Sequence, residues 1–171
     1  MHPSPEHRYV LSLGHLSSPR DAASVLDNAR RLQTEAEAGE PQPLLLSGKH
    51  LVLLCEDDTD ACAILFRRAA GELGAHVAHI RPSASGLAAP PEVQRTARML
   101  GRLYDAVECQ GMATVLVRQL RRDAGVPVYD GIASREHPSA ELAESLGAGG
   151  SPADRRRFVL QAALLQTIAN L

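Results

Sequence analysis

A run of acidic residues follows the first strongly apolar segment of the sequence, LVLLC at positions 51–55. The run contains Glu56, Asp57, Asp58 and Asp60. Hard divalent cations take carboxylate oxygens as ligands, so a metal site is one interpretation of this cluster. Carboxylates also cap the first turn of a helix and interact favourably with its dipole. We favour this structural interpretation, with Asp58 or Thr59 as the capping residue, and expect no bound metal or cofactor.

Three further features could carry chemistry, and each has a structural alternative that we favour. Cys62 lies where a helix would begin, which stabilises a thiolate, but the neighbouring carboxylates oppose ionisation and no His or Lys is adjacent. His137 could polarise a carbonyl or act as an acid, or it could be a loop residue bonded to the backbone. The basic run at Arg155–Arg157 is short and fits a solvated helix face better than a binding patch.

Four short apolar runs predict the strands that would position these residues. They are Leu51–Glu56, His76–Ile80, Ala106–Gln110 and Val126–Asp130. Their near-continuous apolarity is typical of parallel strands covered on both faces. Helical periodicity separates or precedes them in the segments Pro19–Glu37, Thr59–Leu73, Glu92–Tyr104 and Ala113–Ala124. The alternation predicts an α/β fold, with a four-stranded parallel sheet flanked by helices and right-handed crossovers.

The end of the sequence predicts one more helix, from Pro152 to Ala169, with Ser151 as its N-cap. This helix is too apolar to be solvated, so it must dock on this domain or on a partner. A glycine-rich linker precedes it. We therefore divide the chain into an N-terminal extension (1–17), an α/β domain (18–146), a linker (147–152) and a C-terminal helix (153–171).

Composition excludes several classes of function. The chain has 171 residues, 44% of them apolar, and a net charge of −2, which gives no electrostatic footprint for nucleic acid or a membrane surface. Its apolar runs fall well short of the roughly 20 residues of a membrane span, and its first residues lack a signal-peptide pattern. The three cysteines argue against a disulfide framework or a zinc knuckle, and reduced thiols fit a cytoplasmic location.

Three short segments carry a specific pattern: TARMLGRLYDA at 96–106, GVPVYDG at 125–131 and LLSGKHL at 45–51. Together they resemble the first, carbamoyl-phosphate-binding domain of the ornithine and aspartate transcarbamylases. The segment TARMLGRLYDA at 96–106 is similar to the ornithine transcarbamylase pattern TARVLGRMYDGI. GVPVYDG at 125–131, continuing to His137-Pro138, resembles GVPVWNGL…HPTQ, and LLSGKHL at 45–51 resembles LLKGKSL. The likeness runs from about Ser18 to Leu146. The last helix resembles the family's C-terminal helix, so the sequence looks like a first domain joined directly to that helix, with the amino-acid-binding second domain absent.

The resemblance also implies which residues would form the ligand site. The family holds phosphate with a Ser-Thr-Arg-Thr-Arg turn, and the aligned residues here are Thr59, Asp60, Ala61, Cys62 and Ala63. Gln110 stands where the family has the arginine of an Arg-Gly pair. The family's His-Pro-x-Gln corresponds to His137, Pro138, Ser139 and Ala140, so the candidate catalytic histidine is retained and the glutamine is lost. The loop that supplies a lysine in the family, Ser83–Pro91, contains no basic residue here.

These replacements predict impaired ligand binding. A hydrogen bond to a charged group contributes roughly 1.5–3 kcal/mol, so losing three arginines removes about 4.5–9 kcal/mol, on the order of 10³ to 10⁶ in affinity. Asp60 adds a negative charge where the family binds an anion. The resemblance therefore implies a carbamoyltransferase-like pseudoenzyme of amino-acid metabolism, and the sequence leaves open whether it has any enzymatic activity.

Four functions are compatible with this sequence. The first is a non-catalytic assembly or regulatory protein, a homo-oligomer or a partner of a full-length transcarbamylase, since family members form trimers largely through this domain. The second is a protein that binds a different small ligand, such as a cation or an amine. The third is a decaying gene product, against which the intact apolar periodicity argues. The last is carbamoyl transfer like that of ornithine carbamoyltransferase, with a second domain supplied in trans.

Overall fold

The fold is built on a parallel sheet of four strands, as the apolar runs predict. The computed structural model describes residues 19–84, 87, 89–147 and 149–169. The strands are β1 (His50–Leu54), β2 (His76–Ile80), β3 (Ala106–Cys109) and β4 (Val128–Asp130). Their order is β2-β1-β3-β4, and each neighbouring pair is parallel. The predicted extension at 1–17 lies outside the described residues.

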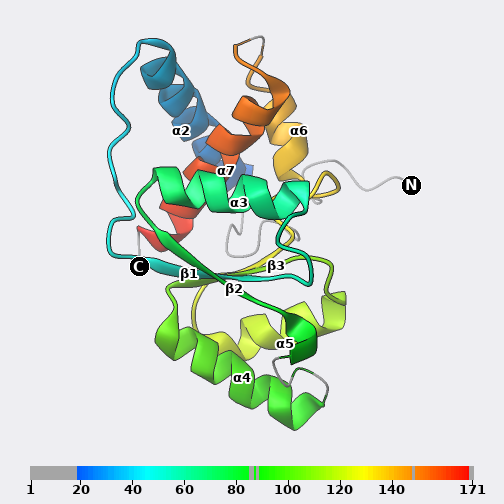
Figure 1. The fold of residues 1–171 in the computed structure, drawn as a ribbon. Coiled ribbons are helices and arrows are strands. Elements are labelled where there is room, and N and C mark those ends of the chain that lie inside the picture. The colour runs from blue at the N-terminus through cyan, green and yellow to red at the C-terminus, as the bar shows by residue number, and fades with distance from the viewer. Residues whose placement is uncertain (1–18, 85–86, 88, 148, 170–171) are drawn as a thin grey trace, which may run out of the picture.

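Helices cover both faces of this sheet (Figure 1). They are α2 (Pro19–Glu37), α3 (Ala61–Glu72), α4 (Pro90–Leu103), α5 (Thr114–Ala124), α6 (Ser139–Glu144) and α7 (Pro152–Ile168), with a 3₁₀ turn at Pro82–Ala84. Helices α4 and α5 lie on one face, and α2, α3, α6 and α7 lie on the other. The predicted α/β architecture is confirmed. Helix α6 was not predicted, because its six residues are too few to show a helical period.

Alternation along β1 explains why one strand serves two cores. Leu51 and Leu53 point into the core shared with α2, α3 and α7, whereas Val52 and Leu54 point into the core shared with α4 and α5. All four side chains are almost completely buried. Successive side chains of a strand face opposite sides of a sheet, so a run without polar residues is what a doubly covered strand requires.

Helix α7 is the central helix of the larger core, and it packs against α2, α3 and α6. The helix is apolar on nearly all sides, which is typical of a buried helix rather than a surface one. The predicted docking of this helix on the domain is therefore confirmed. Its start is also as predicted, since Ser151 caps the helix by accepting a hydrogen bond from the Asp154 N–H, and Pro152 follows. At its other end, Thr167 shares a 2.5 Å hydrogen bond with the Tyr129 hydroxyl of β4.

Helices α4 and α5 approach each other at a glycine. A Cβ atom on Gly101 would lie 1.8 Å from the Ala124 carbonyl oxygen, so no larger residue fits at this crossing. Gly125 then ends α5 in the left-handed conformation with φ of 74°, as expected for a helix C-terminus.

In the TARMLGRLYDA segment we expect three residues, Arg98, Arg102 and Asp105, to form structural ion pairs. The structure confirms this for one of them and not for the other two. Asp105 does so: its carboxylate lies 3.5 Å from the Lys49 ammonium and accepts a 2.8 Å hydrogen bond from the His50 N–H. For Arg98 and Arg102 the prediction is wrong, because both are exposed on α4 and form no ion pair within the described part of the chain. No helix of the described residues is long and apolar enough to cross a membrane.

Candidate functional site

A cavity of about 520 Å³ lies at the carboxyl ends of β1, β3 and β4, and we call it the strand-end cavity. It is lined by Cys55, Glu56, Asp57, Asp60, Cys62, Gln110, Gly111, Asp130, Gly131, Ser134 and Glu136. In open α/β sheets this edge is where ligands bind. Five of the lining residues are carboxylic acids, and none is Lys or Arg. The cavity is therefore suited to a cation and unsuited to an anion.

Hydrogen bonds to neighbouring residues keep the acidic turn in shape. Asp60 is the N-cap of α3, because its carboxylate accepts from the Cys62 N–H at 2.8 Å. The prediction of Asp58 or Thr59 as the cap is wrong by one or two positions. Thr59 instead donates its N–H and hydroxyl to the Asp57 carboxylate, at 2.8 and 2.6 Å. Helix α3 starts at Ala61 for this reason, two residues after the expected start.

Two of these acids are held in the charged form. Glu56 accepts from the N–H and the hydroxyl of Ser83, at 2.7 and 2.8 Å, and these bonds hold its pKa below the ordinary value. The hydrogen bonds from Thr59 lower the pKa of Asp57 in the same way. Both groups are therefore negative at neutral pH. Glu56 also ties the end of β1 to the segment after β2.

Asp58 turns away from the strand-end cavity. Its carboxylate lies 3.2 Å from the Arg67 guanidinium and 3.7 Å from the His79 ring. Arg67 also donates to the Asp58 carbonyl oxygen at 2.7 Å. The described residues contain no group of three or more His, Cys, Asp or Glu side chains that could hold a metal ion. The divalent-metal interpretation of the acidic run therefore finds no support in the geometry.

The thiols near the cavity are held neutral. Burial, followed by the charge of Asp60, raises the pKa of Cys62. Burial and the charge of Asp58 raise the pKa of Cys55. A raised pKa lowers the population of the nucleophilic thiolate at neutral pH. The raised pKa therefore gives no support to the alternative of Cys62 as an activated nucleophile.

The retained histidine lies beside the strand-end cavity rather than in its lining. His137 is buried, and its Nδ1 lies 3.1 Å from the Ser139 N–H nitrogen and 3.0 Å from the Ser139 hydroxyl. With Pro138 it lines a neighbouring cavity of about 350 Å³ that also contains Arg118 and Arg121 of α5. The two cavities share Asp130, Ser134 and Glu136.

Two side chains, those of Glu108 and Arg156, bond the backbone of the loop that carries His137. Glu108 of β3 is completely buried, and both its carboxyl oxygens accept from the Ile132 N–H, at 3.1 and 3.0 Å. Burial raises the pKa of Glu108 to about 8. Arg156 of α7 donates to the carbonyl oxygens of Ala133 and Ser134, at 2.5 and 2.8 Å. Helix α7 therefore helps to shape the edge of the site.

The structure disperses the site residues that the resemblance implies. Asp60, Cys62 and Gln110 line the strand-end cavity, and the Nε2 of Gln110 is buried without a hydrogen-bond partner in the described structure. Ala61 and Ala140 line a different cavity, between α3, α6 and α7, which Cys62 also touches. Thr59 is bonded to Asp57, and Ala63 lies in the core with no exposed surface.

Sequence reasoning missed two acids of the strand-end cavity. Asp130 ends β4 next to β3, and Glu136 follows in the loop. The signal for Asp130 was present, because the carboxyl ends of parallel strands share one edge. Neither the contact of Arg156 with this loop nor the position of Glu136 has a local sequence pattern, since both depend on how the loop folds back.

Comparison with known proteins agrees with this fold. The family model for the carbamoyl-P binding domain of aspartate/ornithine carbamoyltransferase matches residues 8–147. An ornithine carbamoyltransferase of Cutibacterium acnes is 36% identical over 141 residues, 82% of this chain and 42% of the relative. A catabolic ornithine carbamoyltransferase of Burkholderia mallei is 37% identical over 138 residues, 81% of this chain and 40% of the relative.

Solved structures of ornithine carbamoyltransferases also resemble this chain. The ornithine carbamoyltransferase of Pyrococcus furiosus superposes with a TM-score of 0.65 at 26% identity, over 74% of this chain and 40% of that one. The Thermus thermophilus ornithine carbamoyltransferase gives 0.62 at 27%, over 75% and 43%. The chain thus spans about two fifths of the length of these relatives. It belongs to the aspartate/ornithine carbamoyltransferase family, through that family's carbamoyl-phosphate-binding domain.

Proposed function

We propose that this chain keeps the fold of a carbamoyl-phosphate-binding domain but does not bind carbamoyl phosphate in the family's manner. The observation that carries the proposal is the strand-end cavity, whose lining contains five carboxylic acids and no Lys or Arg. On this proposal the chain is a non-catalytic assembly or regulatory protein. Its nine implied site residues, from Thr59 to Ala140, are then a degenerate form of the ligand site.

Electrostatics supports the loss of anion binding. Two unit charges 4 Å apart interact by about 1 kcal/mol in bulk water and about 4 kcal/mol at an effective dielectric constant of 20. Carbamoyl phosphate carries about two negative charges, so each ionised carboxylate that faces it weakens binding by an amount in this range. Glu56 and Asp57 are among the acids kept ionised by their hydrogen bonds.

The test is a calorimetric titration of the full chain with carbamoyl phosphate, followed by a carbamoyl-transfer assay with ornithine. We expect no saturable heat at micromolar ligand and no citrulline above the uncatalysed rate. Saturable binding together with turnover would instead support the alternative of ornithine-carbamoyltransferase-like transfer. A full-length ornithine carbamoyltransferase in the same assay serves as the positive control.

The exposed surface of α4 supports an assembly role. Met99 and Leu103 lie on its outer side, 48% and 60% exposed, beside Arg98 and Arg102. Large apolar side chains grouped on one surface are typical of a protein interface. We propose that the chain forms a trimer or joins a full-length transcarbamylase, with the helix α4 surface as part of the contact.

Sedimentation velocity tests this assembly, with the chain alone and with the Cutibacterium acnes ornithine carbamoyltransferase. We expect a trimer or a mixed complex, and we expect Met99→Glu with Leu103→Glu to dissociate it. Val115 is the matched control, because it is 72% exposed on α5 and Val115→Glu should leave the mass unchanged. A strictly monomeric chain under all these conditions would contradict the assembly role.

A second candidate function is recognition of a small cation or amine at the strand-end cavity, which the five carboxylic acids favour. Titration with 1,4-diaminobutane should then give saturable binding that Asp60→Asn and Asp130→Asn weaken. If the two variants bound the diamine as tightly as the original chain, this candidate would be wrong.

We also propose a reducing, cytoplasmic location for this chain. The three free cysteines, Cys55, Cys62 and Cys109, support it.

A further inference from the structure

A second cavity, of about 630 Å³, lies between the start of α3, α6 and the start of α7. Three arginines line it: Arg135 from the loop after β4, and Arg155 and Arg156 from α7. Glu144 is the one acidic residue in this lining. The cavity therefore has a formal charge of about +2, opposite in sign to the adjoining strand-end cavity.

The described part of the chain supplies no close carboxylate partner for the arginines of this cavity. Among the described residues, none of its three arginines forms an ion pair within 4 Å. Arg156 is half-buried and uses one nitrogen for the carbonyl oxygens of Ala133 and Ser134, while its Nε is buried without a hydrogen-bond partner. Burial, and to a lesser extent the nearby charge of Arg135, lower the pKa of Arg156, whereas the charge of Glu136 opposes them. A bound anion would relieve both effects.

Most of the remaining wall is apolar. Leu65 of α3, Ala140 and Ala143 of α6, and Pro152 and Ala153 of α7 all face the cavity. Guanidinium groups bind carboxylates and phosphates through paired hydrogen bonds, and an apolar wall favours a ligand with a hydrocarbon body. Inorganic anions alone would leave this wall in contact with water.

We propose that the cavity between α3, α6 and α7 binds a small organic anion with a short aliphatic body, held by Arg135, Arg155 and Arg156. The site adjoins the strand-end cavity and shares Cys62 with it, but it is opposite in charge. It depends on α7, which supplies two of the three arginines. Its occupation would link a small anion to the loop that carries His137, because Arg156 bonds that loop.

Titrations of the full chain at low ionic strength, followed by amide chemical shifts, test the proposal. Butyrate and butyl phosphate are the probes, with butan-1-ol and butylamine as matched neutral and cationic compounds. At least one anion should bind saturably and shift the amides of Leu65, Ala140 and Ala143. Arg135→Gln combined with Arg155→Gln should weaken its affinity at least about tenfold.

Two controls separate this site from general charge attraction. Arg98→Gln with Arg102→Gln removes the same charge from α4, across the sheet, and should leave the affinity unchanged (Figure 1). Ala153→Trp fills the cavity without altering its charge and should abolish binding. Each of four results would overturn the proposal. The α4 double variant could lose as much affinity as the double variant of Arg135 and Arg155, or butan-1-ol could bind as tightly as the anions. Ala153→Trp could bind as the original chain does, or neither anion could bind saturably.

Discussion

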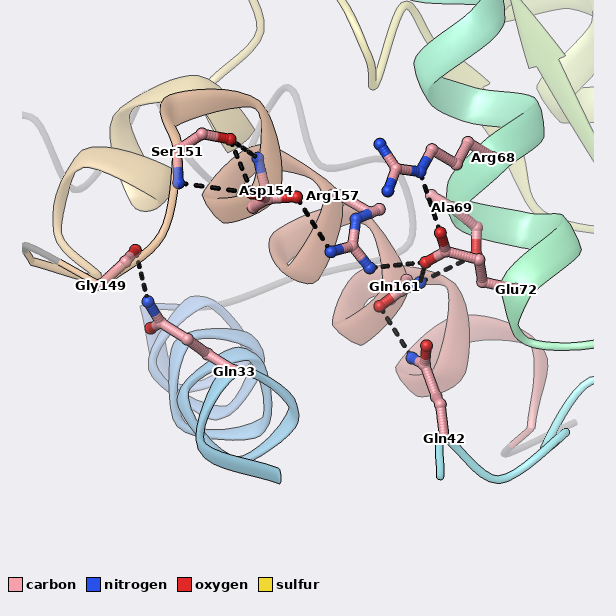
Figure 2. A network of polar contacts seen from close by, with 10 residues as sticks. All are labelled: Gln33, Gln42, Arg68, Ala69, Glu72, Gly149, Ser151, Asp154, Arg157 and Gln161. Carbon is pink, nitrogen blue, oxygen red and sulfur yellow. Dashed lines mark hydrogen bonds and ion pairs between the residues drawn. The ribbon is translucent and has the colours of Figure 1, made fainter. Parts of the chain in front are cut away.

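Arg157 of α7 donates a 2.5 Å hydrogen bond to the carboxylate of Glu72 of α3, a residue 85 positions earlier in the sequence, and so joins the two helices (Figure 2). The same carboxyl group accepts from Arg68 at 2.9 Å and from Gln161 at 3.1 Å. Arg157 also pairs with Asp154, at 3.0 Å, in the first turn of its own helix. Polar contacts as well as apolar packing therefore fix α7 on this domain.

Replacing Arg157 should destabilise the fold. Its side chain is only 12% exposed and contacts Glu72, Asp154 and the Phe158 ring. We expect Arg157→Met to lower the free energy of unfolding by about 1–3 kcal/mol, measured by urea denaturation. Arg68 bonds the same carboxylate but is 56% exposed, so Arg68→Met should cost no more than about 0.5 kcal/mol. If the two substitutions lowered the free energy of unfolding equally, the burial of Arg157 would not explain the strength of its contact with Glu72.

Gly101 and Gly71 form a second matched pair. An added methyl group on Gly101 would overlap the Ala124 carbonyl, so Gly101→Ala must push α4 and α5 apart. We expect a loss of at least about 1–3 kcal/mol in the free energy of unfolding. Gly71 lies in α3 with open space around it, so Gly71→Ala should add up to about 1 kcal/mol. Thermal unfolding of both variants gives the comparison, and a stabilised Gly101→Ala variant would contradict the close crossing.

The fold could be predicted from sequence because its determinants are local. Helix α2 has the predicted bounds of Pro19 and Glu37, since its amphipathic period is uninterrupted and Pro41 follows. The strands were each predicted within two residues at either end. Helix α6 could not be predicted, because its N-cap is Pro138 without a side-chain cap bond.

The site was less predictable because its residues meet through long-range contacts. The acidic turn was visible as a run, but the separation of Asp58 from Asp60 depends on the Arg67 pair. Alignment with the family implied a single site for His137 and Cys62. The structure places them in different cavities, since Ser139 and Arg156 determine the path of the loop after β4. No local pattern encodes such contacts between distant segments.

The buried carboxyl of Glu108 should make stability depend on pH. Its pKa is about 8 in the folded chain and about 4.5 when the chain unfolds, so between these values the folded state binds more protons. The contribution of this carboxyl group to the free energy of unfolding is then fully present below about pH 4.5 and is lost as pH rises through about 8. The slope should reach about 1.4 kcal/mol per pH unit. Urea unfolding at pH 5, 6, 7 and 8 measures it.

Glu108→Gln is the control for this titration. The amide keeps one oxygen to accept from the Ile132 N–H but carries no proton that titrates. The lowered pKa values of Glu56 and Asp57 place their titration below this pH range, and the raised values of Cys55 and Cys62 place theirs above it. The variant should therefore lose most of the slope. If the variant kept the same dependence of unfolding free energy on pH, that dependence would come from a titratable group other than Glu108.

Arginines returned to two of the family's phosphate-binding positions, at the start of α3 and after β3, should restore affinity for phosphate. Asp60→Thr keeps a capping hydroxyl at the start of α3, while Ala61→Arg and Gln110→Arg return two of the family's cations. Ala63 is left unchanged, because it is completely buried and an arginine there would overpack the core. Two charge-assisted contacts contribute about 3–6 kcal/mol together, so calorimetry should detect carbamoyl phosphate binding in the triple variant and none in the original chain. Leu44→Arg, Leu45→Arg and Val115→Arg together add the same charge at exposed positions outside the helix α4 surface and should bind nothing. Failure of the triple variant, with its fold intact, would mean that the remaining acids rather than the missing arginines exclude the anion.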